Sequence, residues 1–370
     1  MATLYVNWSL FWIRLVICVI QFYKVLSDGP PVTMVSVPDG FFEMGSQLLD
    51  DDSHATLVHT IFISSFLMSE TEVTNNAYVT FLNEAMTADN IKVETRDGSS
   101  SDDTTDEVVV GKFGGFNPRK VYIELSGTNQ SEEHPSNRCW IQYDAEKRLF
   151  SLLNETLASW PVTFVTWYGA DAFAKFYNYS LPTEAEWEFA AKGGDRELPF
   201  GSKNGELNPD VINFAESNYG HPINVKHFAS NPNKLYHISG NVWEWVLDWF
   251  CQDFYAASTT MNPYQHIGFD SINMDPDVTS GFIKDTKVIR GGSWKSTRGS
   301  DELYTSYRGR RYPGHASSVV GFRVVQRTSL LRTSRRAISE YCEPKAGNCG
   351  NMQSFQMLVN LVALLTFNLI

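Results

Sequence analysis

Apolar and polar residues follow regular spacings through the first half of the chain. Residues 34–45 predict a β-hairpin, because Asp39-Gly40 at their centre tolerates the positive φ of a tight turn. Residues 56–68 alternate between apolar and polar side chains, which predicts a strand. A further strand is predicted over residues 160–166, with Pro161 near its start. We therefore expect strands to alternate with helices in this part of the chain.

Three helices are predicted from capping residues and apolar spacing. Thr74 is a good N-cap for the first helix, whose apolar side chains share one face. The second helix follows the strand at 160–166 and repeats apolar residues at helical spacing. Thr183 and Glu186 form a capping box at the start of the third helix, which Gly193-Gly194 ends.

Regular spacing is lost in two stretches. Residues 88–131 are polar and acidic, and we interpret them as a surface excursion with one short strand over 120–125. Residues 195–326 show little periodicity beyond short strands at 288–289 and 322–325. Few helices and many short strands predict a loop-rich α+β fold. Because no linker divides residues 35–326, we expect a single domain there.

The charge balance bears on the class of partner. The formal net charge is −12, and no basic stripe is present to meet phosphates, so we do not expect a nucleic-acid partner. Some of the acidity follows a serine run. We interpret this group as a solvated surface loop rather than a cation site; its members are Asp102, Asp103, Asp106 and Glu107.

Both ends of the chain are apolar. Residues 1–27 place Arg14 before an apolar run and end on small residues, which indicates a signal peptide or an uncleaved anchor. Residues 327–370 form a tail whose apolar segment, 355–370, is shorter than the ~20 residues of a membrane helix. A lipid-anchor signal, a tail-anchored helix and an amphipathic end stay open for this tail. We expect a secretory-pathway protein of the endoplasmic reticulum lumen or cell surface, with membrane association through these segments.

In the secretory pathway, cysteines can form disulfides and asparagines in acceptor triplets can carry glycans. Four cysteines would lie in an oxidising lumen, where the sequence leaves three pairings open: Cys139, Cys251, Cys342 and Cys349. Outside residues 1–27, three triplets fit N-glycan acceptors and predict a glycoprotein; they begin at Asn129, Asn154 and Asn178.

Separate motifs occur in an order that resembles the formylglycine-generating enzyme (sulfatase-modifying factor) family. They are Glu43-Met-Gly-Ser46, Glu72-Val-Thr-Asn75, the stretch from Pro161 to Gly194, Asn241-Val-Trp-Glu-Trp245, Gly291-Gly-Ser-Trp294 and Gly321-Phe-Arg323. The resemblance covers residues 35–326 and implies a variant of the C-type-lectin-like fold.

Asn241 and Glu244 are the metal candidates that the resemblance singles out. A side-chain carbonyl and a carboxylate three residues on supply hard oxygen ligands, of which calcium takes about six to eight. This loop matches a family calcium site, and Asn213 matches the family's other calcium site, where Asn218 could replace the usual acidic partner. From the residues alone, a hydrogen-bonded structural loop is the alternative.

The redox centre is where the chain departs from the family. The resemblance implies that the oxidases carry two cysteines after Gly-Gly-Ser, and that these bind copper(I) and oxidise a sulfatase cysteine. The same count here reaches Ser296 and Asp301, and no cysteine occurs between Cys251 and Cys342. Because oxygen donors do not replace soft thiolates, we do not expect copper as a cofactor.

Three arginines and three tyrosines fall within residues 304–312. In the family this segment borders the active-site cleft. Guanidinium groups can pair with an anionic group, and tyrosine rings can stack on a sugar or a peptide. The candidate ligand-binding residues are Tyr307, Arg308, Arg310 and Arg311. Buried structural ion pairs are the alternative.

Three functions follow from these observations. The first is a non-catalytic, calcium-stabilised family member that binds a sulfatase-like protein or a glycan. The second is an oxidoreductase that converts a sulfatase cysteine to formylglycine, with a thiol brought in from Cys251 or Cys342. The third is a different chemistry on the same scaffold, since one fold supports many functions. Because the two aligned thiols are absent, we favour the first.

Overall fold

The computed structural model describes residues 32–49, 54–97, 105–125, 138–266 and 285–327. The chain divides into a first unit, Met1–Arg327, and a second unit, Thr328–Ile370, which lies wholly outside the described residues. The predicted signal peptide or anchor and the apolar tail also lie outside them. Within the described ranges, no helix is both long and apolar enough to cross a membrane.

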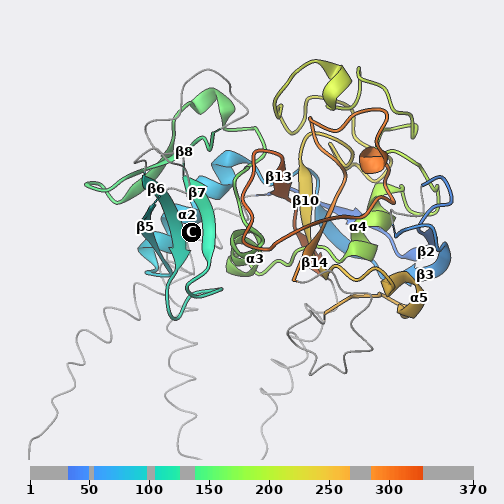
Figure 1. The fold of residues 1–370 in the computed structure, drawn as a ribbon, viewed down its shortest axis with the longest axis horizontal. Coiled ribbons are helices and arrows are strands. Elements are labelled where there is room, and N and C mark those ends of the chain that lie inside the picture. Colours follow the sequence, from blue (N-terminus) through green and yellow to red (C-terminus); the bar gives the residue numbers. More distant parts are fainter. Residues whose placement is uncertain (1–31, 50–53, 98–104, 126–137, 267–284, 328–370) are drawn as a thin grey trace, which may run out of the picture. The chain divides into compact units, whose positions relative to one another are not determined.

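A three-stranded antiparallel sheet contains both ends of the described chain (Figure 1). Its order is β1 (Met34–Val37), β4 (Phe66–Ser69) and β14 (Val325–Arg327). The hairpin predicted over 34–45 is wrong, because β1 pairs with β4, whereas β2 (Gly40–Met44) pairs with β3 (His59–Ile63). Neither Asp39 nor Gly40 adopts the positive φ that the predicted turn required.

A four-stranded sheet carries the motifs of the second half of the chain. Its order is β12 (Gly309–Arg311), β11 (Lys287–Arg290), β10 (Trp243–Trp249) and β13 (Val320–Phe322). The β10–β13 pair is parallel and the other two pairs are antiparallel. Side chains of β10 and β11 are almost all buried, as expected for central strands.

The segment 88–131 differs from the expected surface excursion. It contributes three antiparallel strands: β5 (Ile91–Asp97), β6 (Thr105–Gly111) and β7 (Val121–Leu125). Val109 and Ile123 are fully buried in the core, because this sheet packs against α2 and α3. A separate hairpin joins β8 (Ile141–Asp144) and β9 (Leu149–Leu152). The strand predicted over 160–166 is absent from the described structure, where single bridges involve Pro161 and Val165.

Two helices, α2 (Asn75–Thr87) and α4 (Glu184–Ala191), begin where the predicted caps place them. The structure also describes α3 (Trp167–Phe176) and the short α5 (Phe254–Ala257), with 3₁₀ turns η3 (Glu155–Leu157), η4 (Ala215–Ser217) and η7 (Asp301–Leu303). The Thr74 side chain accepts from the Ala77 amide. The capping box of Thr183 and Glu186 is present at α4.

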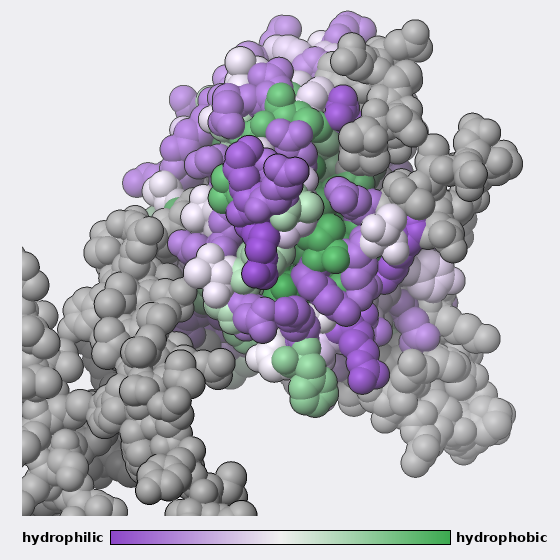
Figure 2. Space-filling view, turned by 90° about the vertical axis from the view of Figure 1, so that its left-hand side faces the viewer, coloured by the Kyte–Doolittle hydropathy of each residue, from purple (hydrophilic) through white to green (hydrophobic). Residues whose placement is uncertain are grey.

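The interior contains two large hydrophobic clusters. One joins α2, α3 and the β5–β6–β7 sheet to Trp243 and Trp245 of β10. The other packs α4 against β2, β3 and Val288 of β11. Figure 2 shows one face of the molecule, where hydrophilic residues predominate and the hydrophobic patches between them are small. Four motifs meet at β10 and β11, because Asn241 bonds to Glu72, Gly240 donates to Gly291, and Arg323 pairs with Glu244.

Candidate functional site

Two glycines turn the chain from β11 into the loop that carries the aligned family positions. Gly291 and Gly292 have φ of +96° and +71°, a region that L side chains rarely adopt. A Cβ on Gly292 would lie 2.9 Å from the backbone oxygen of Glu302. The Gly240 amide donates to the Gly291 carbonyl at 2.8 Å. The turn therefore sets this loop beside the one that carries Asn241.

Ser296, at the first aligned position, is buried and its hydroxyl is held on two sides. The hydroxyl donates to Glu302 Oε2 at 2.5 Å and accepts from the Ser293 amide at 3.0 Å. The Ser296 carbonyl accepts from the Ala215 amide at 2.9 Å. Asp301, at the second aligned position, is half-buried at the start of η7. Sequence analysis did not identify Glu302 as the residue that holds this hydroxyl.

The donor set at these positions does not fit copper(I), which requires soft ligands. Of the cysteines, the structure describes two: Cys139 lies in the first hydrophobic cluster and Cys251 in the second. Burial raises the pKa of the Cys251 thiol, which favours the protonated, less reactive form. Cys342, the other thiol considered for an oxidase, lies outside the described residues.

Asn241 is fully buried and has a φ of +57°. Its Oδ1 accepts from Asn213 Nδ2 at 3.1 Å and from the Ile223 amide at 2.9 Å. Its Nδ2 donates to Glu72 Oε1 at 2.8 Å. The two asparagines that were predicted for separate calcium sites therefore bond directly to each other, whereas Asn218 lies exposed on the surface.

Glu244 is bound by a guanidinium group. Its Oε1 accepts from Arg323 Nη2 at 2.7 Å, and its Oε2 accepts from Arg323 Nε at 2.6 Å and from Trp187 Nε1 at 2.7 Å. A calcium ion on this carboxylate would lie beside the Arg323 charge and be repelled by it. The described residues contain no group of three or more His, Cys, Asp or Glu side chains that could hold a metal ion. The arrangement does not fit calcium on Glu244, and calcium binding by this loop stays a prediction.

Glu72 belongs to the same buried network, which sequence analysis did not predict. Burial, opposed by Arg323 and reinforced by Glu244, raises the pKa of Glu72 to about 8. Its Oε2 has no hydrogen-bond partner within the described structure. A protonated Glu72 carries no charge at neutral pH, so Arg323 faces one full negative charge, that of Glu244.

A second buried ion-pair network links α4 to β11 and to Arg308, the residue before β12. Arg290 donates to Glu184 Oε1 at 3.0 Å and to Glu188 Oε2 at 2.6 Å. Burial alone would raise the pKa of Glu188, but Lys192 and Arg290 together hold it below its usual value. Arg308 makes a two-bond pair with Glu184, at 2.8 and 2.9 Å. Arg308 therefore forms the buried ion pair that was the alternative to ligand binding, and its role in a ligand site stays a prediction.

The other three residues of the candidate ligand group lie nearer the surface. Tyr307 is half-buried and packs against Trp243, with ring centroids 6.0 Å apart. The Arg310 guanidinium carbon lies 4.9 Å from the Phe250 ring centroid. Arg311 is exposed, and its Nη1 donates to the Arg310 carbonyl. These residues stay candidates for ligand binding.

The buried networks could have been partly predicted. Glu184 and Glu188 occur at i and i+4 on a helix whose capping box is evident in the sequence, so they share one face. Their partners, Arg290 and Arg308, lie more than 100 residues further along the chain. No local pattern reports such pairs. Chemically, both networks hold loops together; their buried charges are matched and directed at one another.

Comparison with known proteins identifies the protein family. The Sulfatase-modifying factor enzyme 1-like domain model matches residues 26–328. The chain therefore belongs to this family, which includes proteins named formylglycine-generating enzyme. The predicted family resemblance is confirmed.

Individual relatives differ in their named activities. The formylglycine-generating enzyme of Streptomyces coelicolor is 28% identical over 324 residues, covering 81% of this chain and 91% of that protein. The "Inactive C-alpha-formylglycine-generating enzyme 2" of Bos taurus is 26% identical over 322 residues, covering 80% and 89%. The "Serine/threonine-protein kinase pkn1" of Chlamydia caviae is 32% identical over 292 residues, or 78% of this chain; the match spans only 37% of the kinase.

Among solved structures, PvdO from Pseudomonas aeruginosa has a TM-score of 0.50 and 20% identity, covering 79% of this chain and 93% of that one. This likeness supports a fold of mixed helix and strand content and nothing beyond the fold.

Proposed function

We propose that this domain is a non-catalytic member of its family, a scaffold that binds a protein or glycan partner in the secretory pathway. The observation that carries the proposal is the Ser296 hydroxyl, which is buried and donates to Glu302 at 2.5 Å where the oxidases are expected to hold a thiolate. A hydroxyl and a carboxylate that hydrogen-bond to each other cannot take the place of two soft copper ligands. The relative from Bos taurus that is named inactive, at 26% identity, also supports a non-catalytic function.

Exposed glycan-acceptor asparagines support the secretory pathway as the compartment in this proposal. Asn154 and Asn178, each in an acceptor triplet, are both exposed. Asn154 lies at the start of η3, and its Oδ1 accepts from the Thr156 hydroxyl at 2.7 Å. We include a C-type-lectin-like variant of the α+β fold and a sulfatase-like or other polypeptide partner in the proposal. Calcium on Glu244 is not part of it, because Arg323 pairs with that carboxylate.

The experiment is a direct assay for cysteine oxidation. The copper-loaded full chain is incubated with a synthetic peptide containing the sulfatase Cys-x-Pro-x-Arg motif, and the peptide mass is followed. The Streptomyces coelicolor formylglycine-generating enzyme serves as the positive control. We expect the thiol to persist with this chain and to be lost with the control. Copper-dependent loss of the thiol with this chain would refute the non-catalytic function and favour the oxidase function.

A further inference from the structure

Among the residues that the structure describes, one edge of the β1–β4–β14 sheet is covered and the other is open. On the β14 side, Ser180 and Val325 exchange two backbone hydrogen bonds, at 2.9 and 2.8 Å. On the opposite side, β1 is the last strand and pairs only with β4 among the described elements. An open strand edge presents backbone donors and acceptors that another strand can bind.

The register shows which groups of β1 face outward. The Thr33 carbonyl accepts from the Glu70 amide at 2.9 Å, one position before the pair Met34–Ser69. In an antiparallel ladder, bonded and non-bonded pairs alternate. Val35 and Val37 therefore bond to β4, whereas the N–H and C=O groups of Met34 and Ser36 point away from it. No described residue bonds to these outward backbone groups.

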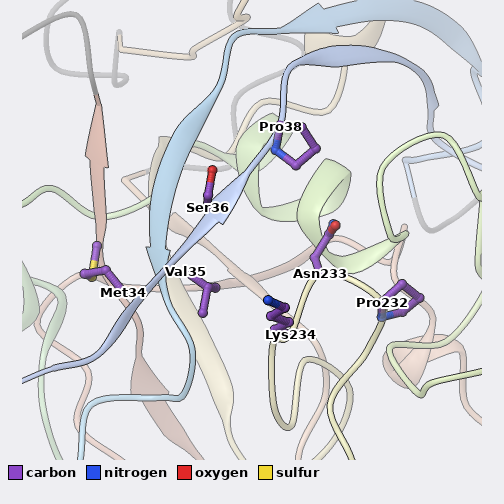
Figure 3. A pocket seen from close by; sticks show the side chains of 7 residues that line it. All are labelled: Met34, Val35, Ser36, Pro38, Pro232, Asn233 and Lys234. Atoms are coloured by element: carbon purple, nitrogen blue, oxygen red, sulfur yellow. The ribbon is translucent and has the colours of Figure 1, made fainter.

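A cavity of about 480 Å³ lies along this part of β1. Its lining joins β1 to the turn opposite, and Figure 3 shows the side chains of both walls around it. The residues are Met34, Val35, Ser36, Pro38, Pro232, Asn233 and Lys234. The volume is in the range of about 300–1,000 Å³ that ligand sites occupy.

The opposite wall is held in place before any partner arrives. The Asn231 side chain accepts from the amides of Asn233 and Leu235, at 2.9 and 3.0 Å, and donates to the Ala190 carbonyl at the end of α4 at 2.9 Å. The side chain of Asn233 donates to the same carbonyl at 3.0 Å. A rigid wall lowers the entropy cost of binding.

The wall also supplies one charge. Lys234 is exposed at a φ of +63°, and its ammonium group has no acidic partner among the described residues. In a chain with a net charge of −12, an unmatched ammonium beside an open strand favours an occupant that carries a carboxylate.

We propose that the β1 edge binds an extended, acidic segment of a partner polypeptide, which adds a strand beside Met34–Val37 and places a carboxylate at Lys234. Strand addition is an established way to recognise peptides: main-chain bonds supply affinity and side-chain pockets supply selectivity. A second copy of this chain would bring a whole sheet to this edge, where the 232–234 turn already lines the side of the cavity opposite β1. The inference rests on the proposed binding function and assigns its site.

The test uses the full chain and a phage-displayed library of random dodecapeptides. Enriched sequences are synthesised with a fluorescent label, and their affinity is measured by anisotropy. Ser36→Pro removes the outward N–H without taking a bond from β4, because proline is tolerated at the free side of an edge strand. Ser36→Ala keeps that N–H and is the matched control. Lys234→Asn removes the charge while suiting the positive φ, and Lys203→Asn changes another exposed lysine.

We expect enriched peptides to carry acidic residues, to bind Ser36→Pro at least about fivefold more weakly, and to bind Ser36→Ala unchanged. Lys234→Asn should weaken binding by roughly two- to fivefold and reduce its salt dependence, with Lys203→Asn unchanged. Failure to enrich any peptide, or equal binding by Ser36→Pro, overturns the inference. So does a dimer in sedimentation equilibrium that Ser36→Pro dissociates, which would assign the edge to a second copy.

The two proposals fail separately. Copper-dependent oxidation of the sulfatase-motif peptide would remove the non-catalytic function and leave the strand-binding edge intact. Absence of peptide binding together with absence of oxidation would remove only the site at β1.

Discussion

Replacing Glu244 with glutamine separates the two roles available to this residue. In the structure the carboxylate makes two short bonds to Arg323 and one to Trp187, and both charged side chains are buried. Glutamine keeps the shape but leaves the Arg323 charge without its partner. Removing one member of a buried pair costs about 3–5 kcal/mol. We expect about 3 kcal/mol, the lower end, because Glu72 can ionise beside the same guanidinium and offset part of the loss.

The assay is thermal unfolding, with and without a calcium chelator. A loss of about 3 kcal/mol lowers the melting temperature of a domain of this size by about 5 °C. The ion-pair account predicts the same drop in both conditions and a wild-type curve that the chelator does not move. Arg323→Met and the double variant complete a cycle, in which the double variant should be more stable than the sum of the single losses implies.

One result would refute this reasoning. If the chelator lowered the wild-type melting temperature to that of Glu244→Gln and left the variant unchanged, the carboxylate would be a calcium ligand. Arg323 would then have to move aside when the ion binds, and the sequence-based prediction of a calcium site would hold.

Three further predictions concern stability and modification. The folded pKa of Glu72, about 8, lies above its ordinary value of 4.5, so its contribution to stability is full below pH 4.5 and is lost as the pH rises toward 8; in urea titrations, Glu72→Gln should gain stability relative to wild type across that interval. Gly240→Ala should cost about 1–3 kcal/mol, since φ is +78° and the new Cβ would meet a backbone oxygen at 2.3 Å, whereas Gly299→Ala, with nothing within 4 Å, should melt like wild type. When the chain is secreted from eukaryotic cells, N-glycosidase should shift its gel mobility, and Asn154→Gln combined with Asn178→Gln should reduce that shift.

Local signals in the sequence predicted the helices well. The caps at Thr74 and Thr183 act within one turn, so their effect can be read without the rest of the fold. Strand pairing is not local. Asp39-Gly40 suggested a hairpin, but β1 pairs with a strand about 30 residues further on, and Pro38 and Asp39 connect two different sheets.

The acidic stretch over residues 88–131 also shows a limit of prediction from the sequence. Asp102, Asp103 and Glu107 gave it the composition of a solvated loop. Val108, Val109 and Val110 are nevertheless all buried, and Val109 belongs to the hydrophobic cluster that contains α2 and α3. Composition averages over both faces of a strand, so it concealed a half-buried sheet.

The sequence identified residues of the candidate site but did not predict their hydrogen-bond and ion-pair partners. Motif order and residue counting identified Ser296, Asp301, Asn241 and Glu244. Their partners come from distant segments: Glu72 is separated from Asn241 by 169 residues, and Arg323 is separated from Glu244 by 79. Only the fold brings these groups together, and it turns two predicted ligand residues, Glu244 and Arg308, into members of buried ion pairs.

The central claim is that the Ser296 loop does not oxidise cysteine, and one measurement addresses it most directly. The native chain and the Ser296→Cys/Asp301→Cys variant are loaded with copper(I) and given the sulfatase-motif peptide, and thiol loss is read by mass. We expect no conversion by the native chain. Any activity in the series should require both introduced thiols, since copper(I) needs two soft donors. Robust conversion by the native chain, abolished by replacing Cys251 or Cys342, would contradict the account.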